Sequence, residues 1–213
     1  MKINVLYLYY DIMNLYGENG NIRVMERMLQ RAGNEVEISR KTITDKEIDF
    51  ASYDFIYCGA GTENSRDVCL CHLKDYSESL KKAYEKGTVM LFTGNSYEML
   101  GKEIRIGEDR VLEGLGLFDF TVFEQRRNRY TGDVTMKCTL LDGNFIGYIN
   151  KCSEVQGISN HLFEVESVVG TVKEGKEGIH EKNFFGTQVI GPVTAKNPLF
   201  GEFLVKLITE GKK

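Results

Sequence analysis

Residues 2–9 read KINVLYLY, and this stretch decides the class of fold. It is rich in residues that favour β-structure and too apolar for a strand with one face in water, so it is typical of a strand buried on both faces of a parallel sheet. Behind a turn rich in Gly and Asn, apolar side chains recur at helical spacing from Ile22 to Leu29, and Gly33 ends the pattern. The sequence therefore predicts a central strand, a loop and a helix over about residues 21–32.

The chain continues with the same alternation of strands and helices. Further strands are predicted at residues 36–38, 55–58 and 89–92, and a long amphipathic helix is predicted over about residues 65–85. Strands that alternate with helices indicate parallel pairing through right-handed crossovers. We therefore expect an α/β fold of three layers, in which helices flank a mostly parallel central sheet.

The C-terminal half has a different pattern of short β-like runs broken by glycines. These runs, which predict a meander or a mixed sheet, are residues 117–123, 133–141, 145–149, 163–169 and 184–190. Pro198 then stands where a closing helix over residues 199–209 begins. The sequence shows no linker, repeat or low-complexity segment, so we expect a single domain over residues 1–213 with extra antiparallel strands in its C-terminal half.

Composition excludes several functional classes. The chain has 213 residues, 42% hydrophobic and 27% charged, which is typical of a globular protein. Its net charge of −4 leaves no basic excess to neutralise phosphates, so nucleic acid is not an expected partner. The first apolar run is far shorter than the roughly 20 residues that span a bilayer. Five scattered cysteines do not suggest a secreted disulfide framework. We expect a cytoplasmic protein without membrane insertion.

Several segments taken together resemble one known family. They are residues 10–22 (YDIMNLYGENGNI), 59–61 (GAG), 129–133 (RYTGD), 157–161 (GISNH) and 186–198 (GTQVIGPVTAKNP). They resemble the CobB/CobQ-like class I glutamine amidotransferases, and most of all the amidotransferase subunit of lipid II isoglutaminyl synthase. The resemblance implies a flavodoxin-like topology, glutamine hydrolysis as the activity of the family, no cofactor, and a Mur-ligase-like synthetase as a partner.

The sequence departs from this family at the catalytic positions. In the family, a nucleophilic cysteine stands on a strand-to-helix elbow and is followed by two glycines, an aromatic residue and a glutamine. The corresponding residues 93–101 read TGNSYEMLG here. Alignment on Tyr97 places the cysteine of the family at Gly94, and alignment on Gly191-Pro192 places its histidine at Ile190.

Glutamine hydrolysis by this route needs a thiolate that attacks the amide carbon. It also needs an imidazole that deprotonates the thiol and later protonates the leaving ammonia. Loss of the nucleophile lowers the rate by several orders of magnitude, and loss of the base adds little because the two groups act as a unit. We therefore expect an inactive amidotransferase-like protein that acts as a binding or regulatory subunit.

The alternative is an active amidotransferase with a displaced nucleophile, which supplies ammonia for amidation of lipid II or of a cobyrinate-type substrate. Cys58 is the first candidate, because it ends a strand at the edge where α/β proteins bind ligands; it also fits the role of a small buried hydrophobe. Ser96 lies near the elbow, where it serves as a nucleophile or as the start of a helix. His161 is the candidate base, or a histidine held by structural hydrogen bonds.

Arg129 is the main candidate for ligand binding. In the resembling family an arginine in this segment grips the carboxylate of glutamine, and a guanidinium suits such bidentate contact. With Asn95 and the turn Gly59-Ala60-Gly61, which in the family helps to shape the oxyanion hole, it would hold a small amino acid such as glutamine. A surface arginine in the cluster of residues 126–129 is the competing interpretation.

Two further kinds of site are disfavoured by spacing. Residues 69–72 (CLCH) are expected on a helix, where positions two apart point about 200° away from each other and cannot share one metal ion. We therefore predict no metal site. The loop at residues 16–21 precedes a helix, as phosphate-binding loops do, but it lacks the established phosphate-binding motifs. A nucleotide- or flavin-binding protein therefore remains a third interpretation.

Overall fold

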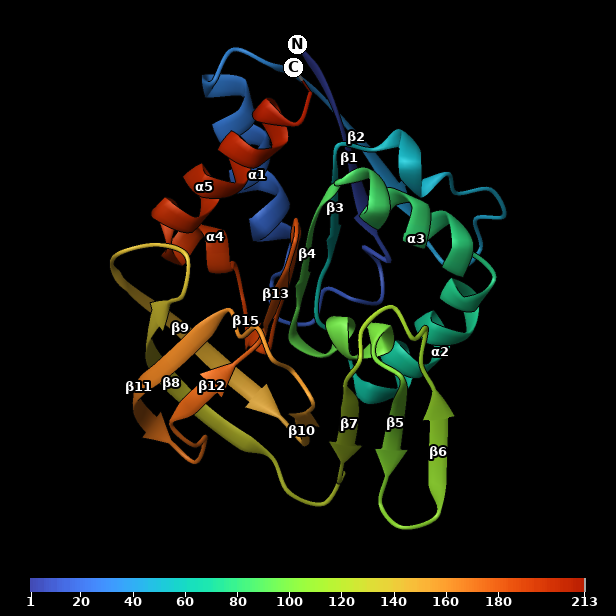
Figure 1. Ribbon diagram of the computed structural model, residues 1–213, viewed down its shortest axis with the longest axis vertical. Coiled ribbons are helices and arrows are strands. Elements are labelled where there is room, and N and C mark those ends of the chain that lie inside the picture. Colours follow the sequence, from blue (N-terminus) through green and yellow to red (C-terminus); the bar gives the residue numbers. More distant parts are fainter. Residues whose placement is uncertain (213) are drawn as a thin grey trace.

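A six-stranded sheet forms the middle of the protein (Figure 1). The structure is a computed structural model and describes residues 1–212. The strand order is β13-β14-β4-β3-β1-β2, and every neighbouring pair is parallel except β13 with β14. The strands are β1 (Lys2–Leu8), β2 (Glu35–Lys41), β3 (Phe55–Cys58), β4 (Val89–Thr93), β13 (Ile179–Glu181) and β14 (Phe184–Thr187).

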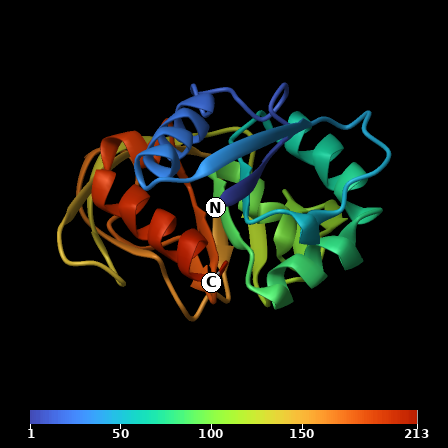
Figure 2. The ribbon, with the colours of Figure 1, turned by 90° about the horizontal axis from the view of Figure 1, so that it is seen from above.

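Helices cover both faces of this sheet (Figure 2). One face carries α1 (Asn19–Arg31), α4 (Val193–Lys196) and α5 (Pro198–Glu210), and the other carries α2 (Glu63–Lys74) and α3 (Ser77–Lys86). Within residues 1–212, no helix combines the length and the apolar character needed to cross a bilayer.

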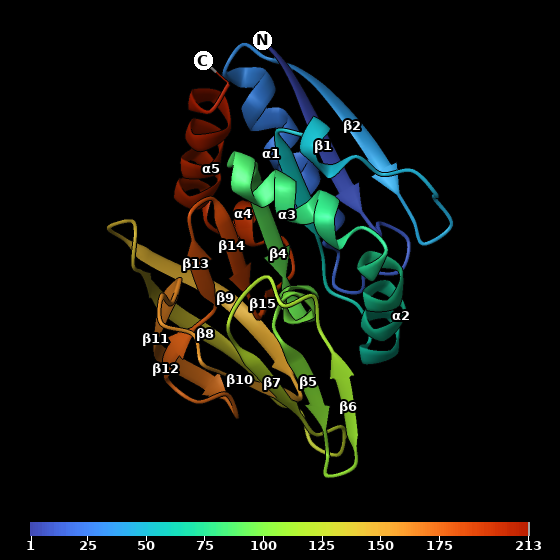
Figure 3. The ribbon, with the colours of Figure 1, turned by 45° about the vertical axis from the view of Figure 1, so that its right-hand side comes forward.

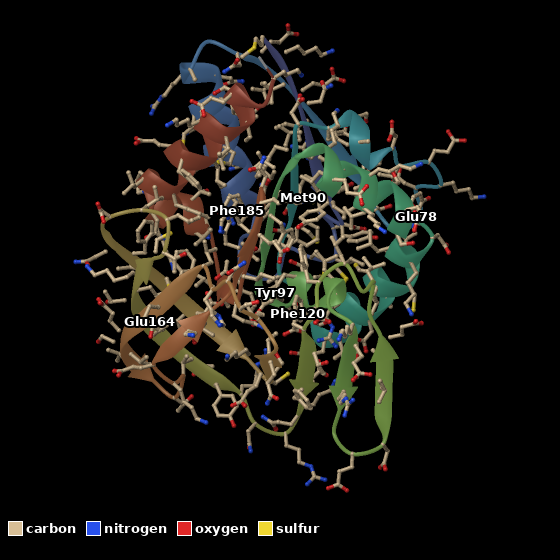
Figure 4. The ribbon with its side chains drawn as sticks, in the orientation of Figure 1. Glu78, Met90, Tyr97, Phe120, Glu164 and Phe185 are labelled. Atoms are coloured by element: carbon tan, nitrogen blue, oxygen red, sulfur yellow. The ribbon has the colours of Figure 1, made fainter. Side chains whose placement is uncertain are left out.

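The central strands are apolar throughout because each contributes side chains to two separate cores. In β1, Val5 and Tyr7 pack with α1 and α5, whereas Leu6 and Leu8 pack with α2 and α3. Figure 4 shows Met90 and Phe185 in the middle of the molecule, while Glu78 and Glu164 lie at its outside. The expectation drawn from the apolar run at the start of the chain is therefore confirmed.

Two smaller sheets extend beyond the carboxyl ends of the central strands (Figure 3). The first has the order β10-β7-β5-β6 and the second β12-β11-β8-β9-β15. The strands of the first are β5 (Glu103–Ile106), β6 (Arg110–Glu113), β7 (Thr121–Glu124) and β10 (Ser153–Gln156). Those of the second are β8 (Tyr130–Cys138), β9 (Asn144–Lys151), β11 (Phe163–Gly170), β12 (Gly175–Glu177) and β15 (Val189–Ile190). The parallel central sheet between helices confirms the expected α/β class, and the smaller sheets contain the antiparallel strands expected in the C-terminal half.

The prediction of one long helix over residues 65–85 is wrong. Two helices, α2 and α3, meet at Asp75 and Tyr76. The Tyr76 hydroxyl donates a hydrogen bond to the carbonyl of Asp45, 3.1 Å away, and its ring lies against those of His72 and Phe50. These contacts with distant segments hold the chain at the break, and they leave no trace in the local hydrophobic periodicity.

Two strand predictions also need correction. The run at residues 184–190 divides into β14 in the central sheet and β15 in the five-stranded sheet, because the chain changes sheets at Gln188. The buried Glu177 carboxylate accepts the Gln188 amide at 2.6 Å, so this N–H is satisfied outside a strand ladder. In the run at residues 117–123, only β7 is a strand; Phe118 and Phe120 before it bury their rings in the core as part of a loop.

Candidate functional site

The candidate site lies at the carboxyl edge of the central sheet, where open α/β sheets bind their ligands. There β3 leads into the turn Gly59-Ala60-Gly61, and β4 leads into a 3-10 helix over Gly94–Leu100. The crossing from β14 to β15 brings Ile190 to the same edge. In Figure 4 Tyr97 lies beside Phe120 just below this edge, with ring centroids 5.9 Å apart.

The backbone at Gly94 turns sharply and has a φ of +60°, a conformation that side chains other than glycine rarely adopt. A Cβ placed there would overlap the Ala60 methyl group and lie 2.9 Å from Cγ2 of Ile190. Real Cβ atoms essentially never approach closer than 3.0 Å. The structure thus brings together the two positions that the resemblance assigns to the nucleophile and the histidine, and leaves no room for a side chain at Gly94.

A buried glutamate, Glu18, binds the backbone and side chains next to both Gly94 and Ile190. Its carboxylate accepts hydrogen bonds from the Tyr57 hydroxyl at 2.5 Å, from Oγ1 of Thr93 at 2.7 Å and from the amide of Gly191 at 2.8 Å. Thr93 precedes Gly94, and Gly191 follows Ile190. Burial raises the pKa of Glu18, although these hydrogen bonds oppose the rise. The sequence analysis treated residues 16–21 as a loop before a helix and did not identify the role of this carboxylate.

The hollow beside Gly94 is almost filled. Its volume is about 10 Å³, which is at the lower limit for a single water molecule. The side chains that fill it come from both halves of the chain, and they include Tyr16, Glu63, Arg66, Asn95, Glu98, Arg129, Cys152, Gln188 and Ile190. The side chains that line the hollow thus leave almost no free volume in it.

An ion cluster centred on the fully buried Arg66 forms the floor of the hollow. Arg66 of α2 pairs with Glu98, with Glu124 at 2.5 Å and with Asp67 at 2.7 Å. Burial alone lowers the pKa of Arg66, but the surrounding carboxylates outweigh this effect and raise it. The Gln188 side chain donates to Glu98 at 2.8 Å and completes the floor. The sequence analysis did not find this cluster. Its local signal is Glu98, a charged residue directly followed by the apolar Met99 and Leu100.

Of the predicted binding residues, Ala60, Gly61, Asn95 and Arg129 line the same hollow and Gly59 does not. The polar side chains of Arg129 and Asn95 are occupied by the chain itself. Nη1 of Arg129 lies 2.7 Å from Oε1 of Glu63, and its Nε donates to Oδ1 of Asn150 at 2.5 Å. The Asn95 carboxamide accepts the Gly61 amide at 3.1 Å and donates to the Gly61 carbonyl at 2.9 Å. Burial lowers the pKa of Arg129, yet the Glu63 carboxylate raises it above its ordinary value.

The structure does not assemble the substitute catalytic residues. The Cys58 thiol is fully buried, and burial raises its pKa well above the ordinary range. The Ser96 hydroxyl donates to the carbonyls of Cys58 and Thr93, at 3.0 and 2.8 Å. His161 lies in the turn before β11 and does not line the hollow. Among residues 1–212, no hydrogen bond joins His161 to Cys58 or Ser96, and the buried Nδ1 of His161 has no hydrogen-bond partner.

The segment CLCH lies on α2 and contacts protein groups. Nδ1 of His72 is 2.9 Å from the Tyr9 hydroxyl, and its Nε2 is 3.1 Å from the carbonyl of Asp45. In the part of the chain that the structure describes, no three His, Cys, Asp or Glu side chains are grouped so that they could hold a metal ion. His72 thus serves to anchor the loop before β3 to α2.

The central sheet with helices on both faces, and the site at its carboxyl edge, define a three-layer α/β protein. Residues 4–198 match the CobB/CobQ-like glutamine amidotransferase domain, and the chain belongs to this family. The resemblance seen in the sequence is confirmed.

Named relatives agree with this assignment. The lipid II isoglutaminyl synthase (glutamine-hydrolyzing) subunit GatD of Staphylococcus aureus is 29% identical over 212 residues, which cover 99% of this chain and 86% of the relative. The GatD subunit of Streptococcus pneumoniae is 26% identical over 204 residues, which cover 92% and 76%. A crystal structure of a glutamine amidotransferase superimposes with a TM-score of 0.62 at 15% identity, covering 96% of this chain and 98% of the other, and this likeness concerns the fold alone.

Proposed function

We propose that this chain is a glutamine amidotransferase-like subunit that does not hydrolyse glutamine. The observation that carries the proposal is the absence of space at Gly94, where Ala60 and Ile190 occupy the volume that a nucleophilic side chain would need. Hydrolysis needs a nucleophile within reach of a base. Gly94 at the elbow supplies no nucleophile, and Ile190 before Gly191 supplies no base.

We propose further that the chain works as a binding or regulatory subunit of a Mur-ligase-like synthetase in the cytoplasm. Two observations support a partner: both named relatives are subunits of a synthase, and the match to them covers nearly the whole chain. The hydrogen bonds that support the site are also present, since Glu18 binds Thr93 next to Gly94 and the amide of Gly191 next to Ile190. A folded scaffold without a nucleophile fits a role in binding and not in turnover.

The test is ammonia release from L-glutamine by the purified chain, alone and mixed with a co-purified synthetase. The staphylococcal relative, whose name describes glutamine hydrolysis, serves as the positive control. We expect no ammonia above background from this chain in either sample, and a stable complex with the synthetase on size-exclusion chromatography. Ammonia release by the native chain would disprove the proposal. Cys58→Ala and Ser96→Ala variants would then show whether either residue is the nucleophile, because its substitution should abolish the release.

A further inference from the structure

Two side chains of the protein itself occupy the polar groups at opposite sides of the hollow. Glu63 places a carboxylate on Arg129, and Asn95 places a carboxamide on the backbone of Gly61. All four residues line the same small hollow. Glutamine carries the same two groups, a carboxylate and a carboxamide, by which proteins recognise it. Glu63 and Asn95 therefore occupy the hollow with the functional groups of that ligand.

The contact between Glu63 and Arg129 is built as a single replaceable interaction. Asn150 of β9 fixes the guanidinium through its side-chain oxygen and its carbonyl, at 2.5 and 3.2 Å, so Arg129 keeps its orientation without Glu63. Only Nη1 faces Glu63, which stands in the first turn of α2 and also accepts the Cys152 thiol at 3.2 Å. The carboxylate of a ligand would bind an arginine whose orientation is already fixed by Asn150.

The position of this pair at the mouth of the hollow makes it weak. The Arg129 side chain is 41% exposed and that of Glu63 is 19% exposed. Ion pairs that water reaches contribute little net stability, because solvent screens them and side-chain entropy opposes them. On the floor, Arg66, Glu98 and Glu124 are buried, and separating them would leave unpaired charges away from water. The mouth is therefore the part of the site that can open while the floor stays fixed.

The Asn95 contact closes the other side. Its carboxamide pairs with Gly61 in both directions, as two peptide groups do in a strand ladder. This ties the turn after β3 to the elbow after β4. The pair uses up the N–H and C=O of Gly61, which are the backbone groups at that point of the hollow.

We propose that Glu63 and Asn95 form an internal latch that keeps a binding site for a small amino acid shut. The ligand class is an amino acid with a free carboxylate and a side-chain amide, and it binds when its own groups displace the latch. This inference rests on the proposed function, because it assumes a site that binds without cleaving.

Binding of L-glutamine to the full chain tests the latch, measured by saturation-transfer NMR and by chemical shifts of the Gly61 amide. Glu63→Ala removes an internal competitor held at high effective concentration, so we expect about fivefold tighter binding than in the native chain. The double variant Glu63→Ala/Asn95→Ala is expected to bind more tightly still. L-Glutaminamide, which lacks the carboxylate, should show no such gain.

Two substitutions serve as controls. Glu164→Ala removes an exposed glutamate that lies at the outside of the molecule (Figure 4) and does not line the hollow, so it should leave binding at the native level. Arg129→Lys in the Glu63→Ala background should abolish the gain, because an ammonium does not reproduce the fork of the guanidinium. Glu63→Gln keeps the size of the side chain and removes its charge, so it replaces Glu63→Ala if that variant unfolds.

Each outcome decides between the two claims. Tighter binding that requires Arg129 and the carboxylate of the ligand supports the latch. A folded Glu63→Gln or double variant that binds no better than the native chain overturns the latch and leaves the proposed function standing. Ammonia released in the same samples by the native chain overturns the proposed function.

Discussion

Adding a single Cβ at Gly94 tests the closed site directly. Gly94→Ala places a methyl group against Ala60 and Ile190, at positions that real Cβ atoms essentially never share. The backbone φ of +60° adds strain of about 1–2 kcal/mol for a residue with a side chain. Overpacking of a tight site costs about 1–3 kcal/mol more. We therefore expect Gly94→Ala to lower the free energy of unfolding by about 2–5 kcal/mol.

The protein contains a matched control for the strain. Gly107 has a φ of +59°, and a Cβ built there meets nothing within 4 Å. Gly107→Ala should therefore cost only the strain of about 1–2 kcal/mol. Urea unfolding curves of both variants give the difference, which reports the collision at Gly94 alone.

The collision with Ala60 should be relieved when Ala60 loses its methyl group, while the close approach to Cγ2 of Ile190 at 2.9 Å remains. In a double-mutant cycle, Ala60→Gly and Gly94→Ala should show a favourable coupling of about 1–3 kcal/mol, because the strain at residue 94 cancels from the cycle. By the same reasoning Gly94→Cys/Ile190→His should release no ammonia, since Ala60 still overlaps the new Cβ. The reasoning is refuted if Gly94→Ala costs no more than Gly107→Ala, or if the cycle is additive.

Three other predictions concern buried groups. Arg66→Ala leaves two buried carboxylates without their cation and should cost about 3–5 kcal/mol in urea unfolding, whereas the exposed Arg127→Ala should cost less than about 0.5 kcal/mol; equal costs would contradict a structural role for the cluster. Burial raises the pKa of Glu18, so the folded state holds a proton that the unfolded state releases, and the contribution of Glu18 is fully present below its unfolded pKa and lost as pH rises through the folded one. Glu18→Gln lacks this dependence on pH, so the unfolding free energy that it loses relative to the native chain should be larger at pH 4.5 than at pH 7. A loss that is larger at pH 7 would contradict a raised pKa for Glu18. Iodoacetamide should label exposed Cys71 in the native chain and spare buried Cys58, whose thiol pKa is raised by burial; mass spectrometry that finds Cys58 modified first would revive it as a nucleophile.

The sequence alone determined the class of fold. The apolar run at residues 2–9 indicated a strand buried on both faces, and β1 contributes to both cores. Such runs are local, and burial on two faces leaves a strand little choice of residue type. The family was also readable, because residues 10–22 and 186–198 keep its pattern. Local sequence failed at Tyr76 and Gln188, where contacts with Asp45 and Glu177 set the ends of elements.

What the sequence determined about the site was an absence. Gly94 and Ile190 lack a thiol and an imidazole, and no arrangement in space supplies atoms that the residues do not have. Whether the vacated volume stays open was beyond the sequence, because it depends on how closely Ala60 packs against an elbow 34 positions away along the chain.

The tertiary structure decided how the site is filled. It buries Arg66 between Glu98 and Glu124, and it lays Glu63 on Arg129, and in each case the partners come from segments far apart in the sequence. Charged residues on a helix look the same in sequence whether they face water or a partner. Which charged residues of α2 are buried follows only from the packing of α2 against the added sheets. A charged side chain is buried at low cost only where an oppositely charged partner is present.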